Sequence, residues 1–250
     1  MAIFTLDRMG VVLAFVFGAL LWFLGLGIGY FMVLESIVFI VVAALATDFG
    51  TAYKKRVGTY QRDRGVRNVL ANGLAPLFMA VGFFLSTNYL PMSHANLLFL
   101  VGFVGSVAAV TADKFGSEIG VFGGRPVMIF GWRRVRIGTS GGVTLLGLGA
   151  GLVASAIMAA PAITVAKFVV ASSLPVGYGT LVHGPALWLS MPMLALYASV
   201  IAGGFIGNVM DSALGYFEEK GTGNKYTSNF FSSVIGGIVA VGLFWLMAAL

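Results

Sequence analysis

The sequence predicts an all-α, polytopic membrane protein, folded as a helical bundle of about seven transmembrane helices. Composition is the first reason: 59% of the 250 residues are hydrophobic and 10% are charged, whereas soluble domains carry about 25% charged residues. The mean hydropathy of +0.97 agrees with this class. The second reason is that the apolar runs are continuous and long enough to cross a bilayer as helices, unlike the short alternating strands of a β-barrel.

Seven apolar runs are separated by more polar segments. The expected spans are 9–26, 30–50, 69–88, 95–112, 141–168, 185–206 and 229–249. The first two runs form one stretch that is too long for a single crossing, so Gly25, Gly27 and Gly29 are expected to turn the chain. The first run lacks a clear small-residue cleavage site and is expected to be a retained helix. We expect residues 1–250 to form a single membrane domain, because this length leaves no room for a separate soluble one.

Lysine and arginine fall mainly on one side of this predicted topology. The loops 48–68, 113–140 and 207–229 carry most of them, whereas the loops 89–94 and 169–184 carry none. Basic loops stay on the cytoplasmic side of membrane proteins. We therefore place these three loops and the N-terminus in the cytoplasm, and the C-terminus outside. The net charge of +6 also fits two further readings, attraction to anionic lipids or an anion-binding face.

The acidic residues predict chemistry at the same face. Asp113 and Asp211 follow the fourth and sixth apolar runs, and only Glu35 falls near the opposite side. No predicted span has a carboxylate at its centre, as an ion transporter more often does. The absence of cysteine excludes disulfides, thiolate metal sites and cysteine nucleophiles. Carboxylates beside Ser, Asn and Lys side chains are typical of magnesium–nucleotide sites, so we predict phosphoryl or nucleotidyl transfer with Mg²⁺.

Asp113 is the first candidate Mg²⁺ ligand, because Mg²⁺ favours one or two carboxylates together with phosphate oxygens and water. Ser117 lies four residues after it, on the same helical face. Asp211, which precedes Ser212, is the second candidate ligand, since it is expected at the same side of the membrane. An interhelical hydrogen bond is the alternative role for Asp211.

Glu118 is the third acidic candidate, with a condition attached. It lies five residues after Asp113, about 140° further round an α-helix. Both acids could bind one site only if the helix breaks, and Gly116 could break it. The alternative is an ion pair with Lys114, at the i,i+4 spacing of a continuous helix.

A glycine-rich segment precedes the fifth span and is a candidate phosphate site. It reads Gly138-Thr139-Ser140-Gly141-Gly142. A glycine-rich turn that opens a helix offers free backbone N–H groups and a favourable helix dipole to phosphate. The alternative is an N-cap followed by packing glycines. It is not a Walker loop, because no Gly-Lys-Ser/Thr follows.

Polar residues also precede the last and third spans. Asn224, Lys225 and Asn229 come before the last span, where Lys225 could contact phosphate and Asn229 could instead cap the helix. Asn68 and Asn72 lie one turn apart where the third span enters the membrane, which suggests a shared pocket. The preceding arginines, including Arg64, are explained equally well by anchoring at the cytoplasmic face.

Taken in order, these segments resemble the phytyl-phosphate kinase family, membrane enzymes of the vitamin E and phytol-salvage pathway with prokaryotic relatives. The resemblance covers about residues 50 to 240 and is fairly specific as an ordered set. The matching segments are Arg64…Asn68…Ala71-Asn72-Gly73, Asp113…Gly116-Ser117-Glu118-Ile119-Gly120, Gly138-Thr139-Ser140-Gly141-Gly142-Val143, Gly207…Asp211-Ser212…Gly215 and Asn224…Asn229.

The resemblance implies a kinase that converts an isoprenoid monophosphate of the phytyl or geranylgeranyl type to the diphosphate, with CTP or another nucleoside triphosphate as donor. Asp113 and Asp211 would then bind Mg²⁺, with Glu118 in support. The phosphate contacts would come from Ser140 with its neighbouring amides, Arg64, Lys225 and Asn229. The expected partners are the isoprenoid monophosphate, the nucleotide and membrane lipids, without nucleic acid. A homodimer stays open.

Two other classes stay open as well. A CDP-lipid synthase-type cytidylyltransferase would use the same kind of magnesium–nucleotide site but release pyrophosphate. A non-enzymatic membrane transporter would move solute without nucleotide turnover. In every case we expect a multi-pass protein of a prokaryotic cell membrane, and for the two enzymes an active site at the cytoplasmic face.

Overall fold

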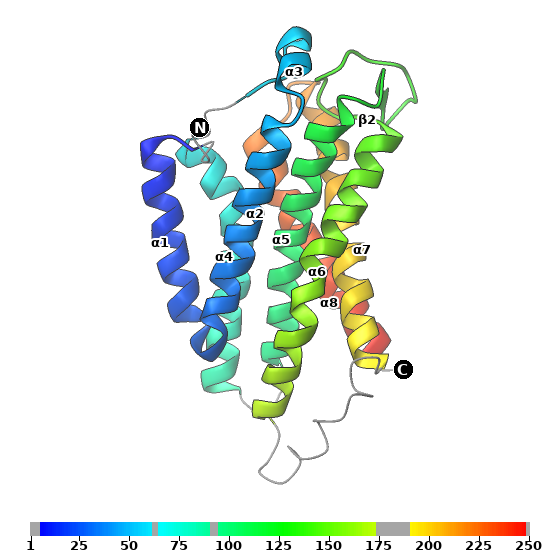
Figure 1. Cartoon of the computed structure of the whole chain (residues 1–250). Coiled ribbons are helices and arrows are strands. Elements are labelled where there is room, and N and C mark those ends of the chain that lie inside the picture. Colours follow the sequence, from blue (N-terminus) through cyan, green and yellow to red (C-terminus); the bar gives the residue numbers. More distant parts are fainter. Residues whose placement is uncertain (1–5, 62–64, 91–94, 174–190, 249–250) are drawn as a thin grey trace.

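The structure, a computed structural model, describes residues 6–61, 65–90, 95–173 and 191–248 as a bundle of long helices (Figure 1). In chain order the elements are α1 (Arg8–Leu24), the 3₁₀ turn η1 (Leu26–Ile28), α2 (Gly29–Asp48), α3 (Thr51–Val57), α4 (Val66–Tyr89), α5 (Ala95–Gly120), β1 (Val127–Met128), β2 (Gly142–Val143), α6 (Leu145–Ser173), α7 (Met191–Glu218) and α8 (Lys225–Ala248).

These helices confirm the predicted class. In the part of the chain that the structure describes, six helical segments are long and apolar enough to cross a membrane. The 17-residue apolar helix α1 adds a seventh. An all-α membrane bundle with about seven transmembrane helices is therefore what the chain forms. The expected turn between the first two spans is also present, because η1 lies between Gly25 and Gly29.

Helix α5 is the centre of the bundle. Every residue from 100 to 112 is buried, and the helix packs against α2, α4, α6, α7 and α8. Small residues let these neighbours approach closely, as is usual in lipid, where helices associate through tight packing. At the contact between α7 and α8, for example, a Cβ added to Gly203 would lie 2.5 Å from the carbonyl oxygen of Gly236. The position of α5 matters for function because Asp113 lies near its end.

The condition for Asp113 and Glu118 to share one site, a break at Gly116, is not met, because α5 continues through Gly116 to Gly120. A glycine inside a helix costs only about 1 kcal/mol relative to alanine. Here its missing side chain makes room for neighbours: a Cβ at this position would lie 2.9 Å from Asn208 Oδ1 and 3.2 Å from the Gly147 carbonyl oxygen. Gly116 therefore serves packing against α6 and α7.

Several predicted span ends are also wrong. Helix α7 continues to Glu218 and not only to 206, α8 begins at Lys225 and not at 229, and α6 begins at Leu145 and not at 141. Hydropathy reports where the chain leaves the apolar phase, whereas helical hydrogen bonding continues through polar residues. The late start of α6 has its own cause, since Gly142–Val143 pairs with Val127–Met128 in a two-stranded antiparallel sheet.

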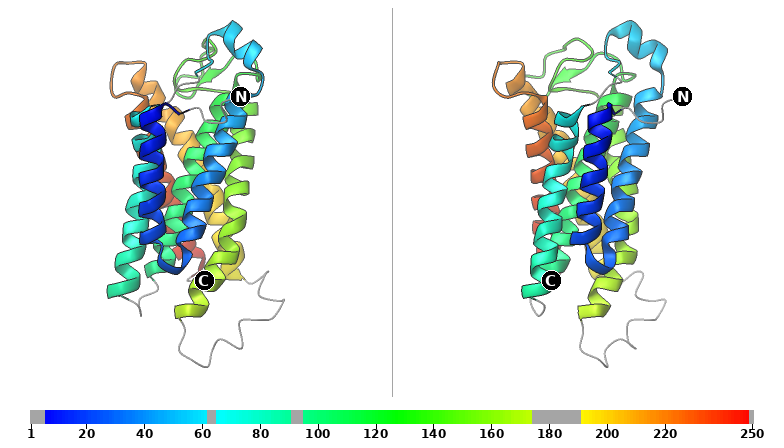
Figure 2. Two further views of the ribbon diagram at one scale, coloured as in Figure 1. Left: turned by 60° about the vertical axis from the view of Figure 1, so that its left-hand side comes forward. Right: turned by 90° about the vertical axis from the view of Figure 1, so that its left-hand side faces the viewer.

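The basic loops gather at one end of the bundle, which we call the polar end. Helix α3, the β1–β2 segment and the connection between α7 and α8 all lie there (Figures 1 and 2). This arrangement fits the predicted topology, in which these loops share one side of the membrane. Placing the polar end in the cytoplasm stays a prediction from positive charge.

Candidate active site

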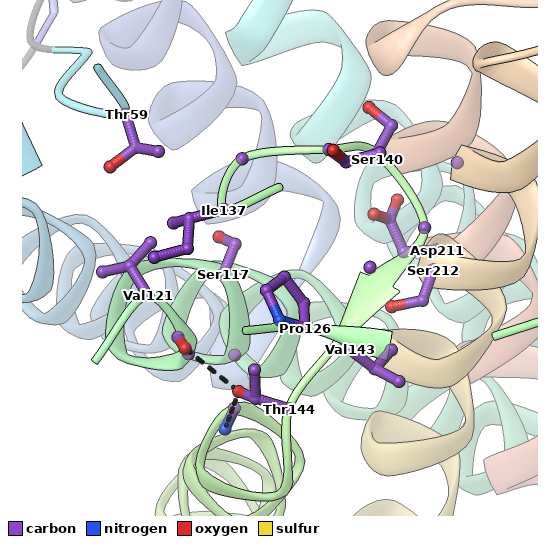
Figure 3. Close-up of a pocket in the computed structure, with 18 of the residues that line it drawn as sticks. Thr59, Ser117, Val121, Pro126, Ile137, Ser140, Val143, Thr144, Asp211 and Ser212 are labelled. Atoms are coloured by element: carbon purple, nitrogen blue, oxygen red, sulfur yellow. Dashed lines mark hydrogen bonds between the residues drawn. The ribbon is translucent and has the colours of Figure 1, made fainter. Parts of the chain in front are cut away.

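A polar cavity of about 330 Å³ lies at the polar end, between the ends of α5 and α7, the start of α6 and the segment 137–144 (Figure 3). It brings together residues that are far apart in the sequence. Eight of the residues predicted for the site line it: Asp113, Ser117, Glu118, Thr139, Ser140, Gly141, Asp211 and Lys225.

Asp113 and Asp211 form a carboxyl pair in this cavity. Their side chains are in hydrogen-bonding contact across the α5–α7 interface, and the Ser232 hydroxyl on α8 donates to Asp211 Oδ1 at 3.2 Å. Two carboxyl groups in contact do not both ionise unless a cation lies between them; without a cation they share a proton. Among the described residues, no group of three or more His, Cys, Asp or Glu is arranged to hold a metal. The donor set is therefore two carboxylates, which suits Mg²⁺ completed by phosphate oxygens and water.

Glu118 is turned away from this pair toward two lysines. Its Oε2 accepts a hydrogen bond from Lys54 Nζ at 2.7 Å, and its Oε1 pairs with Lys114 one turn earlier on α5. Thr47 Oγ1 also donates to Oε1, at 3.1 Å. Lys54 is fully buried and donates in addition to the carbonyl oxygens of Ala46 and Thr47, at the end of α2. Glu118 therefore ties α5 to α2 and α3, and we assign it a structural role instead of the predicted support of the metal.

The glycine-rich segment Gly138–Gly142 forms a turn, and the prediction that it opens a helix is wrong. Gly141 has a φ of 76°, in the left-handed region that favours glycine. A Cβ there would also lie 2.6 Å from Tyr216 N on α7, so the turn packs directly on the α7 backbone. The cap of α6 is instead Thr144, whose Oγ1 accepts from Gly147 N at 3.1 Å.

The Ser140 N–H group, a predicted phosphate contact, is in contact with an acidic side chain. It donates to Glu219 Oε1 at 3.0 Å in an exposed position. A carboxylate oxygen at this N–H is chemically similar to a phosphate oxygen, since both are anionic acceptors. The turn therefore presents an N–H group that can donate to an anion, and Ser140, Thr139 and Gly141 line the same cavity as the carboxyl pair.

Asn208 lines the cavity and was not among the predicted site residues. It is 4% exposed, and its Nδ2 atom has no hydrogen-bond partner. Two glycines leave room for its amide, Gly116 on α5 and Gly151 on α6, because a Cβ on either would press on it. It lies three residues before Asp211, on the same face of α7. The three-residue spacing from Asp211 could have indicated in the sequence that Asn208 belongs to the site. However, a single asparagine in an apolar run is equally typical of interhelical packing.

At the start of α8, the predicted residues divide into different roles. Asn224 caps the helix, because its Oδ1 accepts from Tyr226 N at 3.0 Å and from Thr227 N at 3.2 Å. Lys225 lines the polar cavity. Asn229 lies inside the helix and is not the cap, so the alternative role that the sequence left open for it is excluded.

The remaining predicted residues lie beside the polar cavity or outside the described residues. Asn229 Nδ2 donates to Asn72 Oδ1 at 3.1 Å. Asn68 and Asn72 do not line the polar cavity but a second, apolar one between α1, α2, α4 and α5. The predicted pocket at these asparagines is thus distinct from the one that holds the carboxyl pair. Arg64 falls outside the residues that the structure describes.

Comparison with known proteins gives a family and several relatives. The model of the family described as "Integral membrane protein DUF92" matches residues 2–245. A relative in Methanocaldococcus jannaschii, named "Uncharacterized membrane protein MJ0933", is 29% identical over 238 residues, which cover 94% of this chain and 84% of the relative. No solved structure matches the chain significantly.

Proposed function

For this chain, which belongs to the integral membrane protein family DUF92, we propose that the polar cavity catalyses phosphoryl transfer to a lipid at the membrane surface. The donor is CTP or another nucleoside triphosphate, and the acceptor is an isoprenoid monophosphate of the phytyl or geranylgeranyl type. The enzyme is a prenyl-phosphate kinase of a prokaryotic cell membrane, and the polar end faces the cytoplasm, where nucleotide is available.

The observation that carries this proposal is the contact between Asp113 and Asp211 inside a polar cavity at the polar end. The pair comes from two helices and lies in a polar cavity, whereas the carboxylate of Glu118 is neutralised by two lysines. Carboxylates held together in this way are a site for a divalent cation. Ser140, whose N–H group donates to an anionic oxygen, and Lys225 line the same cavity.

The chain's own residues then have defined tasks in the reaction. Asp113 and Asp211 would hold Mg²⁺, which would supply neutralisation of charge on the donor phosphates. The Ser140 N–H and Lys225 bind phosphate oxygens and orient the donor. Asn208 adds a buried amide donor beside the carboxyl pair, and its unpartnered Nδ2 gains an acceptor when phosphate enters.

The chemical step transfers the γ-phosphoryl group. An oxygen of the acceptor monophosphate attacks the γ-phosphorus, the bond from that phosphorus to the β–γ bridging oxygen breaks, and the nucleoside diphosphate leaves with that oxygen. The acceptor oxygen is already anionic, so the step requires no strong general base. Positioning and charge neutralisation therefore account for catalysis, as is usual for phosphoryl transfer.

A product assay tests this function. Purified protein is incubated with Mg²⁺, CTP or ATP, and C15 to C20 prenyl monophosphates, and the products are identified by phosphorus NMR. We expect prenyl diphosphate and nucleoside diphosphate, without pyrophosphate. A nucleoside-diphosphate lipid together with pyrophosphate would establish the cytidylyltransferase instead, and solute flux in proteoliposomes without turnover would establish a transporter.

Variants of the carboxyl pair make the assay specific to this site. Asp113→Asn and Asp211→Asn are each expected to abolish turnover while the protein still inserts and purifies, because charge stabilisation of several kcal/mol is lost in the transition state. Asp48→Asn is the matched control, since Asp48 is an exposed acid at the same end that does not line the cavity. Near-normal turnover of either pair variant at saturating Mg²⁺ would remove that residue from the metal site.

A further inference from the structure

We propose that the apolar cavity between α1, α2, α4 and α5 is the binding site for the isoprenoid chain of the acceptor, and that Asn68 and Asn72 mark the end through which its phosphate reaches the carboxyl pair. This proposal rests on the proposed function for the identity of the lipid. It adds a location for the lipid chain, in a cavity separate from the polar one.

The cavity has the size and lining expected for one apolar ligand. Its volume is about 640 Å³, within the range of about 300–1,000 Å³ typical of small-molecule sites. Apart from Ser36, Asn68 and Asn72, all the residues that line it are apolar or glycine. The hydroxyl of Ser36 already donates to the Met32 carbonyl oxygen at 2.9 Å, so the two asparagines form the polar part of the lining.

The cavity is reached from the lipid side. Two of its lining residues, Phe15 on α1 and Ile37 on α2, are 77% and 49% exposed at the surface of the bundle. Helix α1, which forms one wall, packs against α2 and α4 at the edge of the bundle (Figure 2). A lipid chain dissolved in the bilayer can therefore enter sideways between helices without crossing water.

The asparagines of this cavity are linked to the carboxyl pair by a short series of polar contacts. Asn72 Oδ1 accepts from Asn229 Nδ2 at 3.1 Å. The Ser232 hydroxyl lies 3.0 Å from the Asn229 carbonyl oxygen and 3.2 Å from Asp211 Oδ1. Asn229 Oδ1 is buried without a hydrogen-bond partner, so this junction has unused hydrogen-bonding capacity. An amphiphile with its chain in the apolar cavity would have its head beside this junction.

The direction of the cavity also matches such an amphiphile. Asn68 and Asn72 lie in the first two turns of α4, which begins at the polar end. On α1, which also begins at that end, the lining runs from Val11 to Leu21, a helix rise of about 15 Å. This is half of a hydrocarbon core of about 30 Å. The chain would thus extend from the polar end toward the middle of the membrane. We assign a single prenyl chain, since the volume is that of one ligand.

Filling the cavity with a side chain provides the first test. Gly18 lines the cavity, and a Cβ added to it meets nothing within 4 Å, so Gly18→Leu adds a side chain at the wall of the chain site, where its Cβ is unobstructed. We expect the KM for a C20 prenyl monophosphate to rise at least about tenfold, with the KM for CTP and the melting temperature unchanged. The matched control is Gly242→Leu on α8, where a Cβ also meets nothing within 4 Å but the position lies outside the cavity.

Photolabelling of the unmodified protein provides the second test, and it needs no turnover. A C15 prenyl monophosphate with a diazirine at the chain end should label peptides of α1 and α2, and unlabelled C20 prenyl monophosphate should compete. Labelling confined to α6, α7 or α8, or competition by phosphatidylglycerol but not by the prenyl monophosphate, overturns the proposal.

The two tests separate this inference from the proposed function. Turnover with an unchanged prenyl KM in Gly18→Leu would reject the chain site and leave the kinase intact. Competed labelling of α1 and α2 without turnover under any donor would support the chain site and reject the kinase.

Discussion

The buried carboxylate of Glu118 has either a structural or a catalytic role, and the substitution Glu118→Gln distinguishes the two. In the structure this carboxylate is shared by Lys54 Nζ, at 2.7 Å, and by Lys114. The substitution keeps the size of the side chain but removes its charge. Lys54, whose side chain is 1% exposed, then keeps its positive charge in a buried place without a carboxylate.

The expected cost follows from this burial. Removing one partner of a buried ion pair destabilises a protein by about 3–5 kcal/mol. Lys54 keeps two acceptors, the carbonyl oxygens of Ala46 and Thr47, so we expect the lower end of that range, about 3 kcal/mol. For a chain of 250 residues, about 2–4 °C is lost per kcal/mol, so the melting temperature should fall by about 6–12 °C.

The assay is thermal unfolding of purified protein in detergent, followed by tryptophan fluorescence, with turnover measured on the same samples at low temperature. The control is Asp48→Asn, at an exposed acid outside the polar cavity, for which the change should stay within about 0.5 kcal/mol. Adding Lys54→Met to Glu118→Gln removes the stranded charge and should recover part of the loss, which a double-mutant cycle measures. If Glu118→Gln melts like the wild type yet loses turnover, the structural role is refuted and Glu118 returns to the metal site.

Three further predictions test the site and the topology. Asn208→Ala should lower kcat/KM for the nucleotide without lowering the melting temperature, because the Nδ2 atom has no partner to lose; a large loss of stability would mean that this amide serves packing. Asn224→Ala removes the cap of α8 and should cost about 1 kcal/mol, seen as a small fall in melting temperature with turnover retained below it. The chain has no cysteine, so single cysteines at Trp132 and Tyr89 allow clean labelling: the former should react only after permeabilisation and the latter from outside, and the reverse pattern would contradict a cytoplasmic polar end.

The bundle could be predicted because the features that produce it can be read from short stretches of the sequence. Long apolar runs, few charges and the placement of lysine and arginine in the loops of one membrane side are each visible in the sequence. The central place of α5 could not be predicted in the same way. In lipid, a face against protein and a face against acyl chains are both apolar, so hydropathy does not distinguish Leu100 inside the bundle from Leu152 at its surface.

The site could be predicted as a set of residues but not as a set of contacts. Asp113 and Asp211 were expected at one membrane face, and this expectation needed only the ends of two apolar runs. The partners of Glu118 required the fold, since Lys54 lies 64 residues away in the chain. The pair of Asn72 with Asn229 spans 157 residues, and no spacing rule reaches that far.

The unbroken helix α5 explains why two acids only five residues apart serve different purposes. A step of five residues turns about 140° round a continuous helix. Asp113 therefore meets Asp211 on α7, whereas Glu118 meets Lys54 on α3 and Thr47 on α2. The charge on one side is neutralised by two lysines and holds the end of α5 in place. On the other side, two carboxyl groups are pressed together in a polar cavity, and this is the arrangement that a cation would complete. Had α5 broken at Gly116, both acids could have turned to one site. A mutation could then not separate the effect of anchoring α5 from the effect of binding a cation.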